Sequence, residues 1–458
     1  MSNFTITGVT SEEIVGLIDL KTFSGKNAGI CYQKEGYFNS PVSDPEKASK
    51  RFPTVAKTGH HSISDHAQVT VVLENISKML AMTLNSLQYY ATSEKSGRYT
   101  VMTGNSKEEQ ELYLKWKDIY RDLILQKYPD IDDIELSKRI CKKWGIDFNS
   151  KTVINRSVSH IKEDEYIEDE LKEFLNDESL PSFKLAQENA RYILSVFTRS
   201  TTMSYTTSLR QWNYIYDWCI KFMKNYEKTD AGIFKNAEPA NFFEQNLYQD
   251  FEELSDFIKD NLYVEELRDI KGRAFDFLGI YSGQNNPITL YEENVDDKLG
   301  FNYTISYPAS FVQIAQAQRH RTITYWMLLN KELDEYFYVP PILEGTKYEY
   351  EWRHDLESVT HIIPQATMFL TVESGTLDDF ILKCEERLCG RAQLEVMERT
   401  KKTARLFLAN YSAFSPMCQA YLDKLRDMDI VPKTKCKLLG TCKEPCRWGC
   451  ENALNRKI

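Results

Sequence analysis

Alternating apolar and polar residues mark the stretch around which the chain is organised. Residues 301–307 place aromatic and aliphatic side chains at every second position, which predicts a strand with one buried face. Pro308 follows where a helix would begin, because its missing N–H costs nothing at the first helical position. Apolar residues then recur at helical spacing. We therefore expect the Arg-His-Arg of residues 319–321 to lie about three turns into a helix, with Gln316 on the same face.

The same order of elements is predicted in both halves of the chain. Each half has a strand, a helix that ends in a polar motif, a connection, an apolar turn and a long helix. A period of about half the chain indicates duplication followed by divergence. The first-half members are the strand 69–73, the helix from about Ser77 that closes at 93–99, the arginine-bearing stretch 188–194 and, after the hydroxyl-rich stretch 198–208, the aromatic helix 209–222. The second-half members are 301–307, the helix with Arg-His-Arg, the turn 360–364 and one last helix spanning 378–395.

This pattern predicts an α+β protein with two tandem domains, each an antiparallel sheet flanked by long helices. The length of 458 residues also favours more than one domain. The predicted boundaries are a first domain at 1–225 with a charged helical insertion at 107–185, a helical linker at 226–275, a second domain at 276–430 and a cysteine-rich tail at 431–458.

Charge and composition narrow the class of protein. A net charge of −10 argues against a general nucleic-acid binder, which needs a basic surplus to neutralise phosphates. No apolar run reaches membrane-spanning length and the first residues lack the features of a signal peptide, so we expect a cytoplasmic protein without a membrane partner. Ten cysteines should then be mostly reduced thiols.

Four of these cysteines close the chain among basic residues. Thiolates beside cations bind zinc or an iron–sulfur cluster, but the spacing lacks the usual Cys-x2-Cys, so packed, reduced thiols are the alternative. The candidate metal ligands are Cys436, Cys442, Cys446 and Cys450.

Two polar strings carry candidate chemistry. Arg319 and Arg321 flank His320, and two guanidiniums beside an imidazole favour an anion; the alternative is a solvated basic helix end. Ser96, Gly97 and Arg98 combine a hydroxyl, a close backbone approach and a guanidinium, which suits a phosphate but also occurs in ordinary turns.

Together these pieces resemble the flavin-dependent thymidylate synthases. The family's motifs are G-H-x-(S/T)-x-x-E-H, then R-H-R-x-x-S-x-N-E-x-S-x-R-Y, and later a helix reading R-x5-A-Q-x-E. The first half contains Gly59-His60, Asp65-His66 and Glu94-x-Ser96-Gly97-Arg98-Tyr99, and Ala190-Arg191 is similar to the family's phosphate-binding arginine. The second half contains Arg319-His320-Arg321, Arg387 and Ala392-Gln393-x-Glu395.

Each half departs from the pattern where the other keeps it. The first half has Ser86-Leu87-Gln88 in place of Arg-His-Arg and Cys219 in place of the terminal-helix arginine. The second half has Met327, Leu329 and Lys331 at the Glu, Ser and Arg positions, and Thr360 in place of Arg191. In the family each active site lies between subunits of a homotetramer. The division therefore resembles a fused dimer whose halves have specialised, and which acts as a pseudo-tetramer when it forms a homodimer.

The resemblance implies reductive methylation of dUMP to dTMP, with FAD as cofactor and NADPH and methylenetetrahydrofolate as co-substrates. It implies catalytic roles for Ser96, Arg319, His320, Arg321 and Arg387. It implies dUMP binding by Glu94, Ser96, Gly97, Arg98, Arg191, Gln316 and Arg387. It implies FAD binding by His60, Ser62, Asp65, Arg210, Arg319, His320 and Arg321. The alternatives are a paralogue that modifies another pyrimidine nucleotide, and a non-catalytic flavin- or nucleotide-binding protein.

Overall fold

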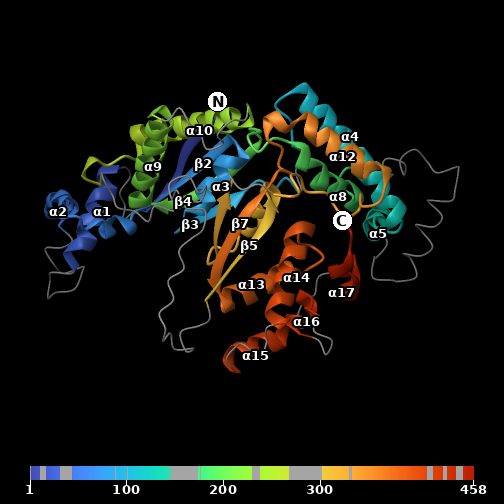
Figure 1. Cartoon of the computed structure of the whole chain (residues 1–458). Helices are drawn as coiled ribbons and strands as arrows, with labels where there is room; N and C mark the ends of the chain where they lie inside the picture. The colour runs from blue at the N-terminus through green and yellow to red at the C-terminus, as the bar shows by residue number, and fades with distance from the viewer. Residues whose placement is uncertain are drawn as a thin grey trace.

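A computed structural model gives the fold of most of the chain (Figure 1). The described residues are 2–10, 17–30, 44–87, 89–98, 100, 102–143, 145, 174–175, 177–228, 238–267, 302–329, 333–409, 416–426, 431–439 and 447–458.

The first sheet has four antiparallel strands in the order β1-β2-β4-β3. Alternate residues of β2 and β4 are fully buried, as the period of a half-buried strand requires. The strands are β1 (Asn3–Val9), β2 (Gln68–Ile76), β3 (Tyr90–Glu94) and β4 (Thr201–Ser208). Around them lie α1 (Leu17–Ile30), α2 (Pro45–Lys57), the 3-10 helix η2 (His61–Asp65), α3 (Lys78–Ser86), α9 (Leu209–Lys228), α10 (Glu238–Asn261) and η4 (Glu265–Leu267).

The second sheet has three antiparallel strands in the order β5-β7-β6. Its helices lie below it in Figure 1, with α13, α14, α15 and α16 forming the lower body of the molecule. Its elements are β5 (Asn302–Ser310), α11 (Phe311–Ala317), β6 (Thr324–Leu328), β7 (Met368–Thr376), α13 (Leu377–Arg387), α14 (Leu394–Ala409), α15 (Pro416–Leu425), α16 (Lys435–Leu439), α17 (Gly449–Asn452) and η8 (Ala453–Asn455).

A third group of helices joins the two sheets on the right of Figure 1. Here α4 packs beside α12, with the rings of Trp116 and Trp352 edge to face at 4.6 Å. This group forms a second apolar core, separate from the large core that contains residues of both sheets. Its elements are α4 (Lys107–Lys127), α5 (Asp133–Lys143), α8 (Pro181–Ala190), η3 (Arg191–Ile193), α12 (Lys347–Ser358) and η6 (Thr360–Ile362).

The predicted class, helices with antiparallel sheets, is confirmed. The hydrophobic pattern also placed β2, β4, α9 and the start of α3 near Ser77 correctly. The described part of the predicted linker is helical, but α10 packs into the large core rather than spanning between domains. In the predicted insertion, α4 buries one face in the second core instead of exposing only charge. None of the described helices is both long and apolar enough to cross a membrane.

The predicted helix start at Pro308 is wrong. Pro308 lies in β5, an edge strand opposite Leu370, where a missing N–H is tolerated. The helix begins at Phe311 instead, because the Ser310 hydroxyl caps it by accepting from the N–H of Gln313. With the helix ending at Ala317, the Arg-His-Arg lies in the following turn, so only Gln316 of the predicted shared face is helical.

Two other predicted helices also end differently. The string at 93–99 does not close a helix: the chain turns through Tyr89, whose φ of 67° is left-handed, and forms β3. The single last helix is two helices, α13 and α14, separated at residues 388–393. Backbone carbonyl groups between the two helices accept hydrogen bonds from side chains, because Trp448 donates to Gly390 O and Arg456 donates to Ala392 O.

Candidate functional site

Five basic side chains from both halves lie within electrostatic reach of one another. We call them the basic cluster. Their charges are only partly offset by the carboxylates of Glu94, Glu188 and Glu386, in a chain whose net charge is −10. Such a concentration favours an anionic ligand. The members are Lys78, Arg98, Arg191, Arg319 and Arg387.

Arg191 is the most deeply buried member, with 4% of its surface exposed. It lies at the start of η3, directly after α8, and its Nε donates to Glu188 O at 3.1 Å. Its Nη2 has no hydrogen-bond partner among the described residues, and burial lowers the pKa of this guanidinium. A buried guanidinium nitrogen without a hydrogen-bond acceptor costs free energy. Nη2 of Arg191 therefore favours an acceptor oxygen supplied by a bound ligand.

The loop of Gly97 lies directly against Arg191. A Cβ at residue 97 would come within 3.3 Å of Arg191 Nη1, so a side chain there would displace the guanidinium. Gln187 of α8 fixes the loop by donating its Nε2 to Gly97 O at 3.3 Å and to Thr100 O. Ser96 Oγ accepts from Arg98 N at 3.3 Å. The predicted Ser-Gly-Arg string therefore meets the predicted phosphate arginine.

Arg98 connects this loop to the second half. Its Nε lies 2.9 Å from Glu188 Oε1, without the geometry of a hydrogen bond. Its Nη2 donates to Arg391 O at 2.6 Å, between α13 and α14. The contact spans a sequence separation of 293 residues, so no local pattern predicts it.

Glu94 is held among cations at the end of β3. Its side chain is 1% exposed and pairs with Lys78, while Arg319 Nη2 lies 3.4 Å and Asn85 Nδ2 3.2 Å from its Oε2. Burial opposes ionisation, but the charges of Lys78 and Arg319 outweigh it and lower the pKa of this carboxyl. Glu94 is thus an ionised anchor that fixes Arg319 against the first half.

Arg387 is positioned by the Arg-His-Arg turn. Its Nε donates to His320 Nε2 at 2.8 Å, and its Nη2 donates to Gln316 O at 3.3 Å. His320 must be neutral to accept this bond. Burial, followed by the charges of Arg387 and Lys383, lowers the pKa of His320 to about 3.

Replacing His320 with glutamine should reduce the acid sensitivity of the fold. Glutamine keeps an acceptor for Arg387 without a titrating group. In the native chain His320 stays neutral while the unfolded chain takes up a proton below pH ~6.5, so stability falls as pH falls between ~6.5 and about 3. From pH 7.5 to pH 5, the native protein should lose about 1–2 kcal/mol more unfolding free energy than His320→Gln.

Urea unfolding at the two pH values measures this difference. Comparison with the variant is needed because burial raises the pKa of Asp250 to about 7, and this group acts in the opposite direction in both proteins. His354→Gln is the control, since its side chain is 66% exposed. Equal losses in all three proteins would show that His320 is not a buried neutral acceptor.

A buried polar network lies beside His320 in the second half. Lys383 Nζ pairs with Glu373 Oε2 at 2.8 Å, and both side chains are 1% exposed. Tyr303 and Tyr307 donate their hydroxyls to the same carboxylate. The network fixes one side of α13, four residues before Arg387.

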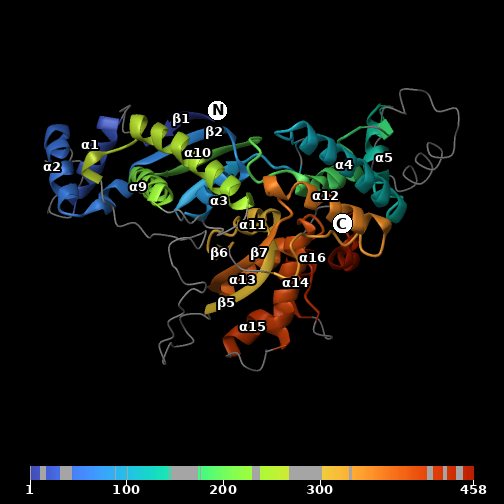
Figure 2. The same ribbon diagram turned by 45° about the horizontal axis from the view of Figure 1, so that its top comes forward.

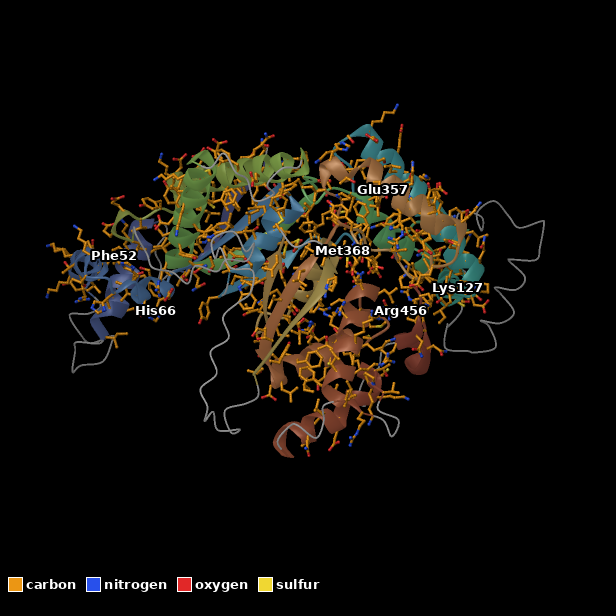
Figure 3. All side chains as sticks on the ribbon, viewed as in Figure 1. Phe52, His66, Lys127, Glu357, Met368 and Arg456 are labelled. Atoms are coloured by element: carbon orange, nitrogen blue, oxygen red, sulfur yellow. The ribbon has the colours of Figure 1, made fainter. Side chains whose placement is uncertain are left out.

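The predicted flavin residues fall into two separate groups. Arg321 donates its Nη1 to Tyr90 O at 3.3 Å, and its guanidinium lies 5.1 Å from the Tyr90 ring centroid, beside the basic cluster. His60, Ser62 and Asp65 lie in or next to η2, where Asp65 pairs with Arg210 at 2.8 Å. The segment of η2 contacts α1, α2 and α9. Figure 3 shows His66 at the left end of the molecule, away from Met368 of β7.

The structure therefore brings together most of the predicted nucleotide residues, from both halves, and leaves the η2 group apart. Sequence reasoning missed Lys78 and Glu188 as members of the site. Glu188 lies on α8, three residues before Arg191, which follows the end of that helix. This helical spacing places the two side chains on the same face. Lys78 follows the cap of an apolar helix, and no periodic signal separates it from a surface lysine.

The cysteine prediction is only partly within the described residues. Cys436 Sγ lies 3.4 Å from Thr434 Oγ1, Cys450 stands in α17, and Cys442 and Cys446 lie outside the described residues. Among the residues that the structure describes, no group of three or more His, Cys, Asp or Glu side chains is placed to hold a metal ion. The metal site stays a prediction.

Curated protein sequences gave no match. Among solved structures, the chain is similar to the flavin-dependent thymidylate synthase ThyX from Helicobacter pylori, complexed with FAD and dUMP. The two share 13% identity over 57% of this chain and 99% of the other, with a TM-score of 0.24. Residues 24–220 match the family model described as thymidylate synthase complementing protein, Thy1. Over these residues the chain thus matches the thymidylate synthase complementing proteins, which confirms the resemblance that its motifs indicated.

Proposed function

We propose that the protein is a flavin-dependent thymidylate synthase that binds dUMP at the basic cluster and converts it to dTMP. The observation that carries this proposal is the buried Arg191, whose Nη2 lacks a partner among the described residues while three other guanidiniums converge on the same region. A nucleotide monophosphate supplies the missing acceptor oxygens and charge. The family match over residues 24–220 supports the same reading.

In this proposal the phosphate is held mainly by the first half. Arg191 and Arg98 provide charge, and the loop of Ser96 and Gly97 provides a hydroxyl and a close backbone approach. Glu94 acts indirectly, because its carboxylate is already paired with Lys78 and Arg319. Ser96 hydrogen-bonds the substrate rather than attacking it, since its Oγ accepts from Arg98 N and no basic side chain among the described residues is hydrogen-bonded to it.

The second half would hold the uracil ring. Arg387, fixed by His320 and by the carbonyl of Gln316, is placed to stabilise negative charge that develops on a ring carbonyl oxygen. A neutral His320 leaves the positive charge of this pair on Arg387. FAD, when bound, supplies the hydride, with NADPH and methylenetetrahydrofolate as co-substrates.

The flavin residues support a homodimer. Arg319 belongs to the basic cluster, and His320 and Arg321 lie beside it. In contrast, a largely exposed polar surface at η2 is formed by His60, Ser62, Asp65 and Arg210. The hydrogen-bond donors of these two groups of residues fit an extended cofactor that carries phosphates. We propose that η2 of a second chain completes the FAD site, which makes the dimer a pseudo-tetramer.

We also propose that the two halves arose by duplication. The three strands that follow η2 and the three of the second sheet have the same spatial order, β2-β4-β3 and β5-β7-β6. Ser77 caps α3 and donates to buried Asp250, and Ser310 caps α11 and donates to buried Glu395. The halves also exchange a reciprocal pair of hydrogen bonds, Val196 N to Ile363 O and Gln365 N to Leu194 O.

Three positions of the other half that correspond to residues of this site are apolar, and Lys331 is the one basic residue among the corresponding positions named above. Leu87, Cys219 and Met327 take the places of His320, Arg387 and Glu94, and all three are buried in the large core. Burial raises the pKa of Cys219, so its thiol stays neutral. An anion would find no charge from these three residues, which supports one nucleotide site in each chain.

Tritium release from ring-labelled dUMP tests the proposed function. The purified protein should be yellow and should release tritium only when methylenetetrahydrofolate and NADPH are both present. A yellow protein that binds dUMP without release would be a sensor instead. Release from another pyrimidine nucleotide, but not from dUMP, would identify the paralogue alternative.

A further inference from the structure

A polar cavity has Arg98 in its wall, whereas Arg191 and Arg387 are not among its lining residues. Its volume is about 240 Å³, against the ~10–15 Å³ that one water needs by the same measure. Its walls come from one face of α8, from the turn between α13 and α14, and from the C-terminal segment that carries α17 and η8. Figure 1 shows the C-terminus between α8 and α17, where these segments meet.

The lining of this cavity is strongly basic. Lys184, Arg391, Arg447 and Arg456 line it together with Arg98, and Glu188 is the one acidic side chain among its lining residues. That carboxylate already pairs with Arg98 at 2.9 Å. The basic side chains come from separate segments, so they surround the space rather than forming a stripe on one surface. Such an arrangement fits an anion with several charged oxygens.

The C-terminal wall is built into the fold. Arg456 is 5% exposed and donates to backbone oxygens of Ala392, Ala453 and the last residue, Ile458. Trp448 donates its indole N–H to Gly390 O at 3.0 Å and packs edge to face on Tyr128 at 5.0 Å. The cavity is therefore preformed, and an anion entering it does not have to order this segment.

The cavity and the basic cluster are joined by one residue. Arg98 lines the cavity and also interacts electrostatically with Arg191 and Arg387. Arg191, in contrast, is not among the lining residues. The cavity and the basic cluster thus share Arg98 and otherwise offer an anion different basic residues.

We propose that this cavity is a second anion site, which binds the polyphosphate chain of a nucleoside di- or triphosphate next to the site of the monophosphate substrate. The length of such a chain suits a space that is too large for one phosphate and lined by several cations. Occupation of the cavity would draw Arg98 away from the nucleotide site. The two ligands should therefore weaken each other's binding without excluding each other. This coupling rests on the proposed function; the anion site itself does not.

Calorimetry with tripolyphosphate, and inorganic phosphate as the shorter probe, tests the site. Tripolyphosphate should bind the full-length protein once per chain and at least tenfold more tightly than phosphate. The double variant Lys184→Gln/Arg447→Gln should weaken tripolyphosphate at least tenfold and change dUMP affinity less than twofold. Arg405→Gln, an exposed arginine on α14, is the matched control and should change neither.

Arg191→Met separates this inference from the proposed function. It should weaken dUMP and leave tripolyphosphate binding unchanged. Loss of both ligands in Arg191→Met, or full displacement of tripolyphosphate by dUMP, would make the cavity part of the nucleotide site and overturn the inference. Absence of tripolyphosphate binding to the native protein would also overturn it. If tripolyphosphate binds as expected but dUMP does not bind at all, the anion site stands and the proposed function fails.

Discussion

Replacing Arg191 with methionine should weaken dUMP binding by about 2–4 kcal/mol, which is roughly thirty- to thousand-fold. The expected loss is large because Arg191 is 4% exposed and its Nη2 has no partner among the described residues. A phosphate oxygen would therefore gain a charge-assisted bond from a group that is already desolvated. Methionine fills the space without charge, so the loss would come from the missing guanidinium.

Calorimetric titration of dUMP measures this effect and also counts the sites. The native protein should bind one dUMP per chain, because Leu87, Cys219 and Met327 take the places of His320, Arg387 and Glu94 in the other half and are buried in the large core. Arg191→Lys should recover part of the affinity, since it keeps the charge and loses the planar fork. Arg405→Met, on the exposed surface of α14, should bind like the native protein. Unchanged affinity in a folded Arg191→Met protein would remove the basis for the proposed site.

Replacing Lys383 with methionine should lower the free energy of unfolding by about 3–5 kcal/mol. The change leaves the Glu373 carboxylate, 1% exposed, without the cation that lies 2.8 Å away. The hydroxyls of Tyr303 and Tyr307 would still donate to it, but neither carries a compensating charge. An uncompensated charge in the interior is one of the few single changes with so large an effect.

Urea denaturation of three variants separates the charge from the packing. The double variant Glu373→Gln/Lys383→Met removes both charges and should recover most of the lost stability. Lys50→Met is the control, because Lys50 forms an ion pair with Glu46 in which both side chains are mostly exposed, and it should cost less than ~0.5 kcal/mol. A Lys383→Met protein as stable as Lys50→Met would show that Glu373 is neutral in the native state.

Periodicity predicted the elements that bury one face over several turns. β2 and α9 were found because apolar residues recur along their whole length. Element ends were missed where a single residue decides them, such as the cap at Ser310 or the left-handed Tyr89. The break between α13 and α14 depends on donors from Trp448 and Arg456, which lie far along the chain. No local pattern contains that information.

The sequence motifs predicted the main residues of the site, but not the residues that hold them in place. Arg98 and Arg191 stand in recognisable strings, and the structure brings them together. Lys78 and Glu188 do not belong to such strings, and their importance comes from the charges that surround them after folding. The bond from Arg98 to Arg391 joins two halves that sequence reasoning treated as separate domains.

The reciprocal hydrogen bonds at residues 194–196 and 363–365 have a consequence for how this chain can evolve. When identical subunits meet on a twofold axis, every substitution at the axis is imposed on both sides at once. Here the two sides differ, and Pro364, which has no N–H, stands opposite Ser195, whose N–H donates to Glu109 at 2.7 Å. Proline is tolerated at residue 364 because only residue 195 needs a backbone N–H donor. Under the proposed duplication, joining the halves in one gene frees each side of this contact to accept mutations that a symmetric assembly would have to bear twice.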